Sequence, residues 1–257
     1  MALLFEVQNR IATITINRPE VMNAMDPETY KELSDAWIEV RNNPEIWAAV
    51  ITGAGTRSFT AGADLKKTVT KRPEKWELFL TQKDQLLNRG LEVWKPIIAA
   101  VNGYCLGGGV TLLLATDIRV ATPNATFGLS EVKRGLIPAN GGTQRALRQL
   151  PYPVAMDLLM TGRTISAEEA LRYGLINEIV PQENLMERAL DYAKQIVENA
   201  PLAVRAVKEL AVKSQYLSLQ DGLRMEQLFE SYLRGTEDAI EGPKAFAEKR
   251  KPNFTGN

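Results

Sequence analysis

Three consecutive glycines, Gly107 to Gly109, constrain the fold of this chain more than any other feature of its sequence. The apolar run PIIAAV (residues 96–101) before them predicts a short buried strand, and VTLLLA (residues 110–115) after them predicts a buried helix. A helix start without Cβ atoms presents unpaired N–H donors and the positive end of the helix dipole to a ligand. The stretch therefore predicts either a tight packing turn or a site for an anion or a polarised oxygen.

The composition narrows the chemistry, because the chain has no histidine and a single cysteine, Cys105. This excludes Ser-His-Asp and Cys-His nucleophile systems and leaves almost no ligands for a metal site, so we expect none. Proton transfer is left mainly to carboxylates, Tyr or Lys. Cys105 can form no intramolecular disulfide, and its place beside the glycines predicts a small buried residue in a protein of a reducing compartment.

Charge and hydropathy give no sign of a nucleic-acid or membrane partner. The 31 basic residues balance the 31 acidic ones, and no window approaches the roughly 20 apolar residues of a membrane span. The first residues, MALLFEVQNR, lack a basic start and a long apolar run. We therefore expect a cytoplasmic protein that binds neither nucleic acid nor membrane, although a mature organellar matrix protein would share these features.

Strand and helix patterns alternate in the first half of the chain, which predicts an α/β fold. We expect a hairpin over 4–16, a helix over 27–40 capped by Asp26, strands over 48–52, 96–101 and 117–121, and a helix over 74–93. From about residue 141 the pattern is nearly all helical, with a capping box at Ser166 and helices over 185–199, from 201, over 219–234 and over 236–248. The prediction is an α/β core, residues 1–199, followed by a helical region, residues 200–257.

Two glycine-bearing loops, FTAGADLK (residues 59–66) and YCLGGG (residues 104–109), each follow a strand-like run. Two such loops can offer two N–H donors to one oxygen, as in an oxyanion hole, where each donor contributes about 3–4 kcal/mol to the transition state. Glu131 lies in a third segment that is mostly apolar and glycine-rich, which raises a carboxyl pKa and suits proton transfer. Asp64, beside a glycine, is typical of a turn or cap, and Lys66 and Lys67 are typical of a solvated pair.

Five segments in order resemble the enoyl-CoA hydratase/isomerase, or crotonase, superfamily: FTAGADLK, NGYCLGGG, FGLSEVKRGLIPANGGTQR, TGRTISAEEALRYGLINEIV and AFAEKRKPNF. The resemblance covers essentially the whole chain. It implies a crotonase-like spiral of β-β-α units whose C-terminal helical region makes trimer contacts, in a homotrimer or homohexamer. It also implies an acyl-CoA substrate and no separate cofactor, since coenzyme A is part of the substrate.

By motif position, the resemblance implies roles for individual residues. Ala63 and Gly108 would donate their N–H groups to the thioester carbonyl, and Glu131 would be the catalytic acid/base. Lys66 would face the nucleotide end of coenzyme A. The positions that would bind the substrate or its coenzyme A are Ala24, Ala61, Asp64, Leu65 and Lys66, together with Phe229 and Lys249 of a neighbouring subunit.

The chain departs from the family pattern at Thr111, where hydratases carry a first glutamate two positions after the triplet. A threonine hydroxyl can bind a water but cannot take its proton near neutral pH. Three interpretations stay open: a hydratase-like lyase in which Glu131 acts on a water held by Thr111, a double-bond isomerase that uses Glu131 alone, and a substrate whose own acidic group completes the site. An RNA-binding or ligand-binding protein on this scaffold is the alternative from another class, and the charge balance argues against RNA.

Overall fold

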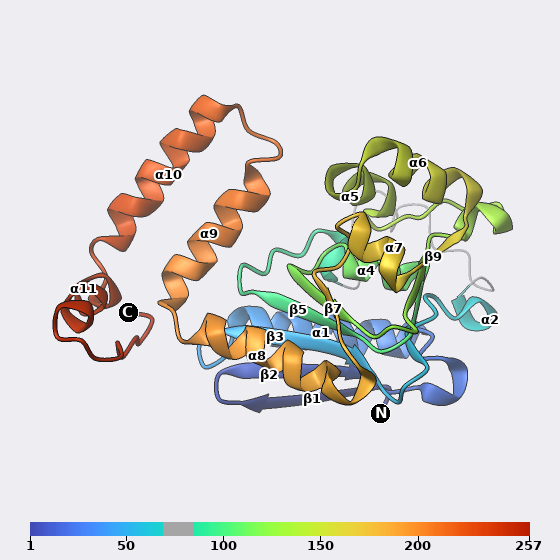
Figure 1. Cartoon of the computed structure of the whole chain (residues 1–257), viewed down its shortest axis with the longest axis horizontal. Helices are drawn as coiled ribbons and strands as arrows, with labels where there is room; N and C mark the ends of the chain where they lie inside the picture. The colour runs from blue at the N-terminus through green and yellow to red at the C-terminus, as the bar shows by residue number, and fades with distance from the viewer. Residues whose placement is uncertain (69–84) are drawn as a thin grey trace.

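The computed structural model describes residues 1–68 and 85–257. The described chain forms an α/β core on a six-stranded and a four-stranded sheet, from which three C-terminal helices extend as an arm (Figure 1). Within the described ranges, no helix is both long enough and apolar enough to cross a membrane.

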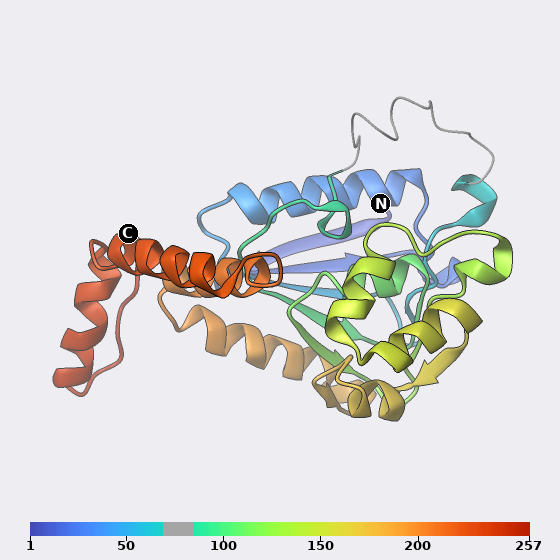
Figure 2. The ribbon, with the colours of Figure 1, turned by 90° about the horizontal axis from the view of Figure 1, so that it is seen from above.

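The larger sheet is buried on both faces at its inner strands and is mostly exposed at its first edge strand. Its strands, in spatial order, are β1 (Leu3–Gln8), β2 (Ile11–Ile16), β3 (Ala48–Gly53), β5 (Ile97–Val101), β7 (Ile118–Ala121) and β10 (Glu178–Ile179). Only β1 and β2 are antiparallel, as the predicted hairpin; the other pairs are parallel. Side chains of β5 alternate between two apolar clusters, with Ile97 on the side of Trp37 and Ile98 on the side of Ala189. The inner strands β3 and β5 are almost wholly apolar because α1 covers one face of the sheet and α8 the other (Figure 2).

The smaller sheet consists of three-residue strands. In spatial order they are β4 (Ser58–Thr60), β6 (Tyr104–Leu106), β8 (Thr126–Gly128) and β9 (Thr164–Ser166). β4, β6 and β8 come directly after β3, β5 and β7 in the chain, and they pair in parallel, while β9 closes the sheet antiparallel. The chain therefore makes three similar turns, each adding one strand to each sheet, which confirms the spiral of β-β-α units.

Helices fill the turns of the spiral and cover the sheets. The α-helices of the core are α1 (Pro27–Asn42), α2 (Leu65–Thr68), α4 (Gly108–Leu113), α5 (Gly142–Gln149), α6 (Tyr152–Thr161), α7 (Ala167–Arg172) and α8 (Leu185–Val197). The 3-10 turns are η1 (Pro19–Val21), η2 (Leu87–Arg89), η3 (Glu131–Arg134) and η4 (Gln182–Asn184). Asp26 caps α1 by accepting from the Thr29 N–H at 3.0 Å, and Ser166 and Glu169 form the predicted capping box of α7.

The expected helix over 74–93 is wrong in its second half. Residues 74–84 lie outside the described residues, and residues 85–93 contain only the 3-10 turn η2. Gly90 ends this turn with φ +96°, a left-handed conformation that stops a helix. The helix after the glycine triplet begins at Gly108, earlier than the expected residue 110, because the glycines themselves form its first turn.

The arm consists of α9 (Pro201–Lys213), α10 (Leu219–Leu233) and α11 (Glu237–Ala247). It is joined to the core through α9, where the Lys208 ammonium lies 2.7 Å from Asp117 and donates to the Lys95 carbonyl at 2.9 Å. No residue of α10 is buried. The predicted division between residues 199 and 200 falls between α8 and α9, and it stays a prediction.

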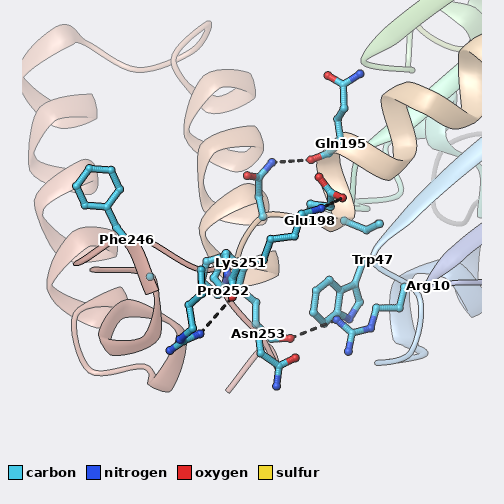
Figure 3. A pocket seen from close by; sticks show the side chains of 13 residues that line it. Arg10, Trp47, Gln195, Glu198, Phe246, Lys251, Pro252 and Asn253 are labelled. Carbon is cyan, nitrogen blue, oxygen red and sulfur yellow. Dashed lines mark hydrogen bonds and ion pairs between the residues drawn. The ribbon is translucent and has the colours of Figure 1, made fainter. Parts of the chain in front are cut away.

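A cavity of about 690 Å³ lies where the arm returns to the core (Figure 3). Arg10 stacks over Trp47 at 3.7 Å from the ring centroid and donates to the Phe254 carbonyl at 3.3 Å. Lys251 lies 3.4 Å from Glu198, so the basic side chains of this cavity already have partners. These contacts attach the end of the chain to the core.

Candidate active site

Three chain segments meet at one edge of the smaller sheet, because each follows one of its parallel strands. The register places Thr60 beside Cys105 and Leu106 beside Gly128, so the residues that follow each strand also lie close together. Ala63, Gly108 and Glu131 are two or three residues beyond these strand ends. The structure therefore brings together the two predicted carbonyl donors and the predicted acid/base.

The two donor loops approach so closely that only glycine fits at Gly62. Its φ is +88°, and a Cβ there would lie 2.6 Å from the Leu106 carbonyl oxygen and 2.9 Å from the Gly108 nitrogen. Similarly, the Ala63 nitrogen is only 3.5 Å from the point that a Cβ on Gly108 would occupy. The N–H groups of Ala63 and Gly108 are thus neighbours across a backbone contact.

Both N–H groups are free to bind a ligand. The Met25 N–H donates to the Gly62 carbonyl at 2.8 Å, and the Asp64 N–H donates to the Met25 carbonyl at 2.8 Å. In this parallel bridge, Met25 bonds to the Gly62 carbonyl and the Asp64 N–H, which lie on either side of Ala63. The Ala63 N–H therefore points away from Met25. Gly108 opens α4, so its N–H has no partner within the helix. No described residue accepts a hydrogen bond from either group, which is the condition for an oxyanion hole.

Glu131 faces the glycine turn with its carboxylate. Its Oε1 is 3.2 Å from the point that a Cβ on Gly107 would occupy, and its Oε2 is buried without a hydrogen-bond partner among the described residues. Burial raises the pKa of Glu131 above the ordinary 4.5, against smaller opposing effects of its own backbone N–H and of Arg134. A half-buried carboxylate with one buried oxygen left unpaired is unfavourable for folding and suited to proton transfer.

An ion-pair network holds the loop that carries Ala63. Asp26 lies 2.7 Å from the Lys67 ammonium and 3.2 Å from the Arg18 guanidinium, which is also 3.4 Å from Asp64. Burial acts to raise the pKa of Asp26, but the hydrogen bonds from Lys67 and Thr29 and the charge of Arg18 hold it well below its usual range. Asp64 is thus ion-paired in a turn, and Lys67 is exposed, as expected, while its ammonium is paired with Asp26. The sequence indicated Asp26 only as a helix cap.

Thr111 is buried, and its hydroxyl already has two partners. It donates to the Gly108 carbonyl at 3.0 Å and accepts from Asn88 Nδ2 at 2.9 Å. The sequence analysis missed Asn88, because a lone asparagine in a short 3-10 turn carries no motif. Cys105, as expected, is fully buried, and burial raises the pKa of its thiol well above the usual range, so it is not a nucleophile.

The remaining predicted positions divide between the loops and the arm. Ala24 and Ala61 lie in the loops around Gly62, while Leu65 and Lys66 are exposed at the start of α2. Phe229 is on α10 and Lys249 follows α11, so one chain does not bring them to its own Glu131 (Figure 1). In the described parts of the chain, no cluster of His, Cys, Asp and Glu could hold a metal ion.

This chain belongs to the enoyl-CoA hydratase/isomerase family, whose model matches residues 6–257. It is 45% identical to an (E)-benzylidenesuccinyl-CoA hydratase from Thauera aromatica, over 100% of both chains. It is 40% identical to a carnitinyl-CoA dehydratase from Citrobacter koseri, over 99% of this chain and 98% of that one. A crystal structure of an enoyl-CoA hydratase from Bacillus anthracis matches with a TM-score of 0.92 and 34% identity, over 100% of both chains. The protein is an enzyme of this family, as the sequence motifs predicted.

The contact at Gly62 predicts a severe effect of one added methyl group. Gly62→Ala should lower the free energy of unfolding by about 2–6 kcal/mol, from roughly 1–3 for the strained φ and roughly 1–3 for the overlap with Leu106 and Gly108. Gly174→Ala is the matched control, since Gly174 has φ +75° but no atom within 4 Å of the added Cβ, and should cost about 1 kcal/mol. Urea unfolding measures both; equal losses would contradict the close approach of the loops.

The burial of Glu131 predicts how its replacement changes stability with pH. Because the folded-state pKa is raised, ionisation destabilises the folded protein as pH rises from about 4.5 through the folded-state pKa. Glu131→Gln should therefore melt at a higher temperature than wild type at pH 7, with the difference disappearing near pH 4. A lower melting temperature at pH 7, in scans of both proteins, would contradict a carboxyl pKa raised by partial burial.

Proposed function

We propose that the protein catalyses the reversible addition of water to a 2-enoyl-CoA thioester, with Ala63 and Gly108 as carbonyl donors and Glu131 as the acid/base. The observation that carries the proposal is the half-buried Glu131 carboxylate, whose buried Oε2 has no hydrogen-bond partner among the described residues, beside two unpaired N–H groups. The similarity to a hydratase and to a dehydratase favours water addition and removal over double-bond migration.

One carboxylate is enough for this reaction. The water oxygen bonds to the β-carbon while Glu131 takes one water proton, and the C=C electrons move onto the thioester as an enolate. The N–H groups of Ala63 and Gly108 stabilise the enolate oxygen. Protonated Glu131 then gives its proton to the α-carbon, so H and OH are both added and the carboxylate is restored. Dehydration is the same sequence reversed.

A double-bond isomerase is the second candidate, and the absence of a carboxylate at Thr111 favours it. Glu131 would then remove a proton from one carbon and return it to another through the same enolate. A substrate with its own acidic group is a further possibility for completing the site. An RNA-binding role on this scaffold has less support, because basic and acidic residues balance.

The substrate's coenzyme A is proposed to lie along the loops of Ala24 and Ala61 and the start of α2, where Asp64, Leu65 and Lys66 lie in sequence. Lys66 is exposed and can meet a phosphate group. We propose no separate cofactor. A cytoplasmic location is proposed because the lone Cys105 can form no intramolecular disulfide.

We propose a homotrimer or homohexamer assembled through the arm. Exposed apolar side chains are concentrated on its helices: Val207, Val212, Leu219, Leu223, Leu228, Tyr232, Ile240 and Phe246. Such a surface is typical of a protein interface. In this assembly Phe229 and Lys249 of one subunit would contact the coenzyme A bound to another.

Product analysis separates the two reactions. From a panel of 2-enoyl-CoA and 3-enoyl-CoA thioesters in heavy water, the 2-enoyl-CoA members should give a product with the mass of added water and deuterium at the α-carbon. Glu131→Gln should lower turnover about 10²–10⁴-fold with little effect on thioester binding, while the exposed Glu187→Gln should not. Double-bond migration without added water would establish the isomerase, and a normal rate in Glu131→Gln would exclude Glu131 as acid/base.

If the subunits assemble through the arm, charged substitutions on its exposed apolar surface should dissociate the oligomer. Leu228→Glu together with Tyr232→Glu should convert the oligomer to a monomer, because charges would be buried at the interface. Val7→Glu places a charge at a partly exposed apolar position of the core and should leave assembly intact. Light scattering after size exclusion gives the mass; a wild-type monomer, or an unchanged oligomer in the double variant, would contradict assembly through the arm.

A further inference from the structure

We propose that Thr111 and Asn88 form a buried clamp that orients the Gly108 N–H, so that the residue at position 111 acts by positioning a carbonyl donor. The inference rests on the proposed function, since it assigns Gly108 to the oxyanion hole. In this chain, a positioning threonine would thus stand where the family's hydratases carry a glutamate. The alternative is that Thr111 holds the water.

The first contact is through the Thr111 backbone. Its N–H donates to the Gly107 carbonyl at 3.1 Å. The Gly107 carbonyl and the Gly108 N–H belong to one planar trans peptide group, in which the C=O and N–H point in opposite directions. Fixing the carbonyl along α4 therefore directs the donor N–H out of the helix start, toward the Ala63 side of the site.

The second contact is through the Thr111 side chain, whose hydroxyl donates to the Gly108 carbonyl at 3.0 Å. Thr111 thus holds the peptide groups on both sides of the Gly108 Cα. Glycine restricts its own backbone least of all residues, so a donor flanked by Gly107 and Gly109 needs restraint from outside. The clamp supplies that restraint without adding a side chain to the turn, where the Gly62 contact leaves no room.

Asn88 fixes the direction of the hydroxyl. Its Nδ2 donates to Thr111 Oγ1 at 2.9 Å, so it occupies a lone pair and leaves the single hydroxyl proton for the Gly108 carbonyl. The backbone of Asn88 is itself held, because its main-chain carbonyl accepts a hydrogen bond from Arg145 at 3.0 Å. Thr111 is 1% and Asn88 5% exposed; the hydrogen bond between them is buried, and the one to the Gly108 carbonyl is partly buried.

The test reads the polarisation of a bound carbonyl directly. Crotonyl-CoA carrying carbon-13 at its thioester carbonyl is bound to Glu131→Gln, which slows turnover, and the carbonyl stretch is recorded by isotope-edited infrared spectroscopy before the substrate is consumed. When Thr111→Val is added to Glu131→Gln, the carbonyl stretching frequency should return part of the way toward its value in water. When Thr111→Ser is added instead, the frequency shift caused by binding should be retained. With Glu131 intact, Thr111→Val should lower kcat about tenfold or more with little change in KM, and Asn88→Ala should act in the same direction.

Thr116→Val is the matched control. Thr116 is also buried, its hydroxyl also donates to a carbonyl three residues earlier, that of Leu113, at 2.7 Å, and it also accepts a hydrogen bond, from Arg119 at 3.4 Å. Thr116→Val should therefore lower the free energy of unfolding about as much as Thr111→Val does, and it should leave the frequency of the carbonyl stretch unchanged. If Thr111→Val does not fold, Thr111→Ser and Asn88→Ala carry the test.

The outcomes separate the clamp from the proposed function. If the carbonyl stretch does not shift when crotonyl-CoA binds to Glu131→Gln, the assignment of Ala63 and Gly108 as an oxyanion hole is contradicted. If the full shift of the carbonyl stretch persists in Thr111→Val or in Asn88→Ala, the clamp is contradicted and the oxyanion hole is not. If kcat is also lowered in Thr111→Val, the role of Thr111 is to hold the attacking water. A shift lost equally in Thr116→Val would also overturn the clamp, because a general loss of stability would then explain it.

Discussion

The parallel pairing of the three-residue strands β4, β6 and β8 is the constraint on which the rest of the structure depends. Each strand is too short to be stable alone, but each continues a buried strand of the larger sheet. Their pairing brings the loops of Ala63, Gly108 and Glu131 to one edge of the smaller sheet. The site is assembled from three turns of one spiral, so the fold positions all its groups together.

The site concentrates unfavourable local features that the surrounding structure must offset. The N–H groups of Ala63 and Gly108 and a carboxylate oxygen of Glu131 lack partners among the described residues, and Gly62 adopts a left-handed conformation. Around them, hydrogen bonds and ion pairs hold both donor loops. Asp26 and its two cationic partners hold one donor loop, and Thr111 with Asn88 holds the other. The donor N–H groups and the carboxylate are thus left free for a substrate, while the loops that carry the N–H groups are fixed in place, as a preorganised active site requires.

The sequence predicted what long patterns encode. The hairpin, the strands buried on both faces, the Asp26 cap and the helices after residue 141 follow from periodicity and capping residues, and motif resemblance located Ala63, Gly108 and Glu131. Three-residue strands are too short for any period, so the smaller sheet could not be predicted from the residues alone. Asn88 and the Arg18–Asp26–Lys67 network depend on contacts between segments far apart in the chain. The helix expected through residue 93 fails because Gly90 terminates the turn.

A crystal structure of Glu131→Gln with a bound 2-enoyl-CoA tests the central claim most directly. The account predicts a thioester carbonyl oxygen about 2.7–3.1 Å from both the Ala63 and the Gly108 nitrogen, with the β-carbon beside the side chain of residue 131. A carbonyl oxygen that contacts neither nitrogen, with the thioester held elsewhere on the protein, would contradict it.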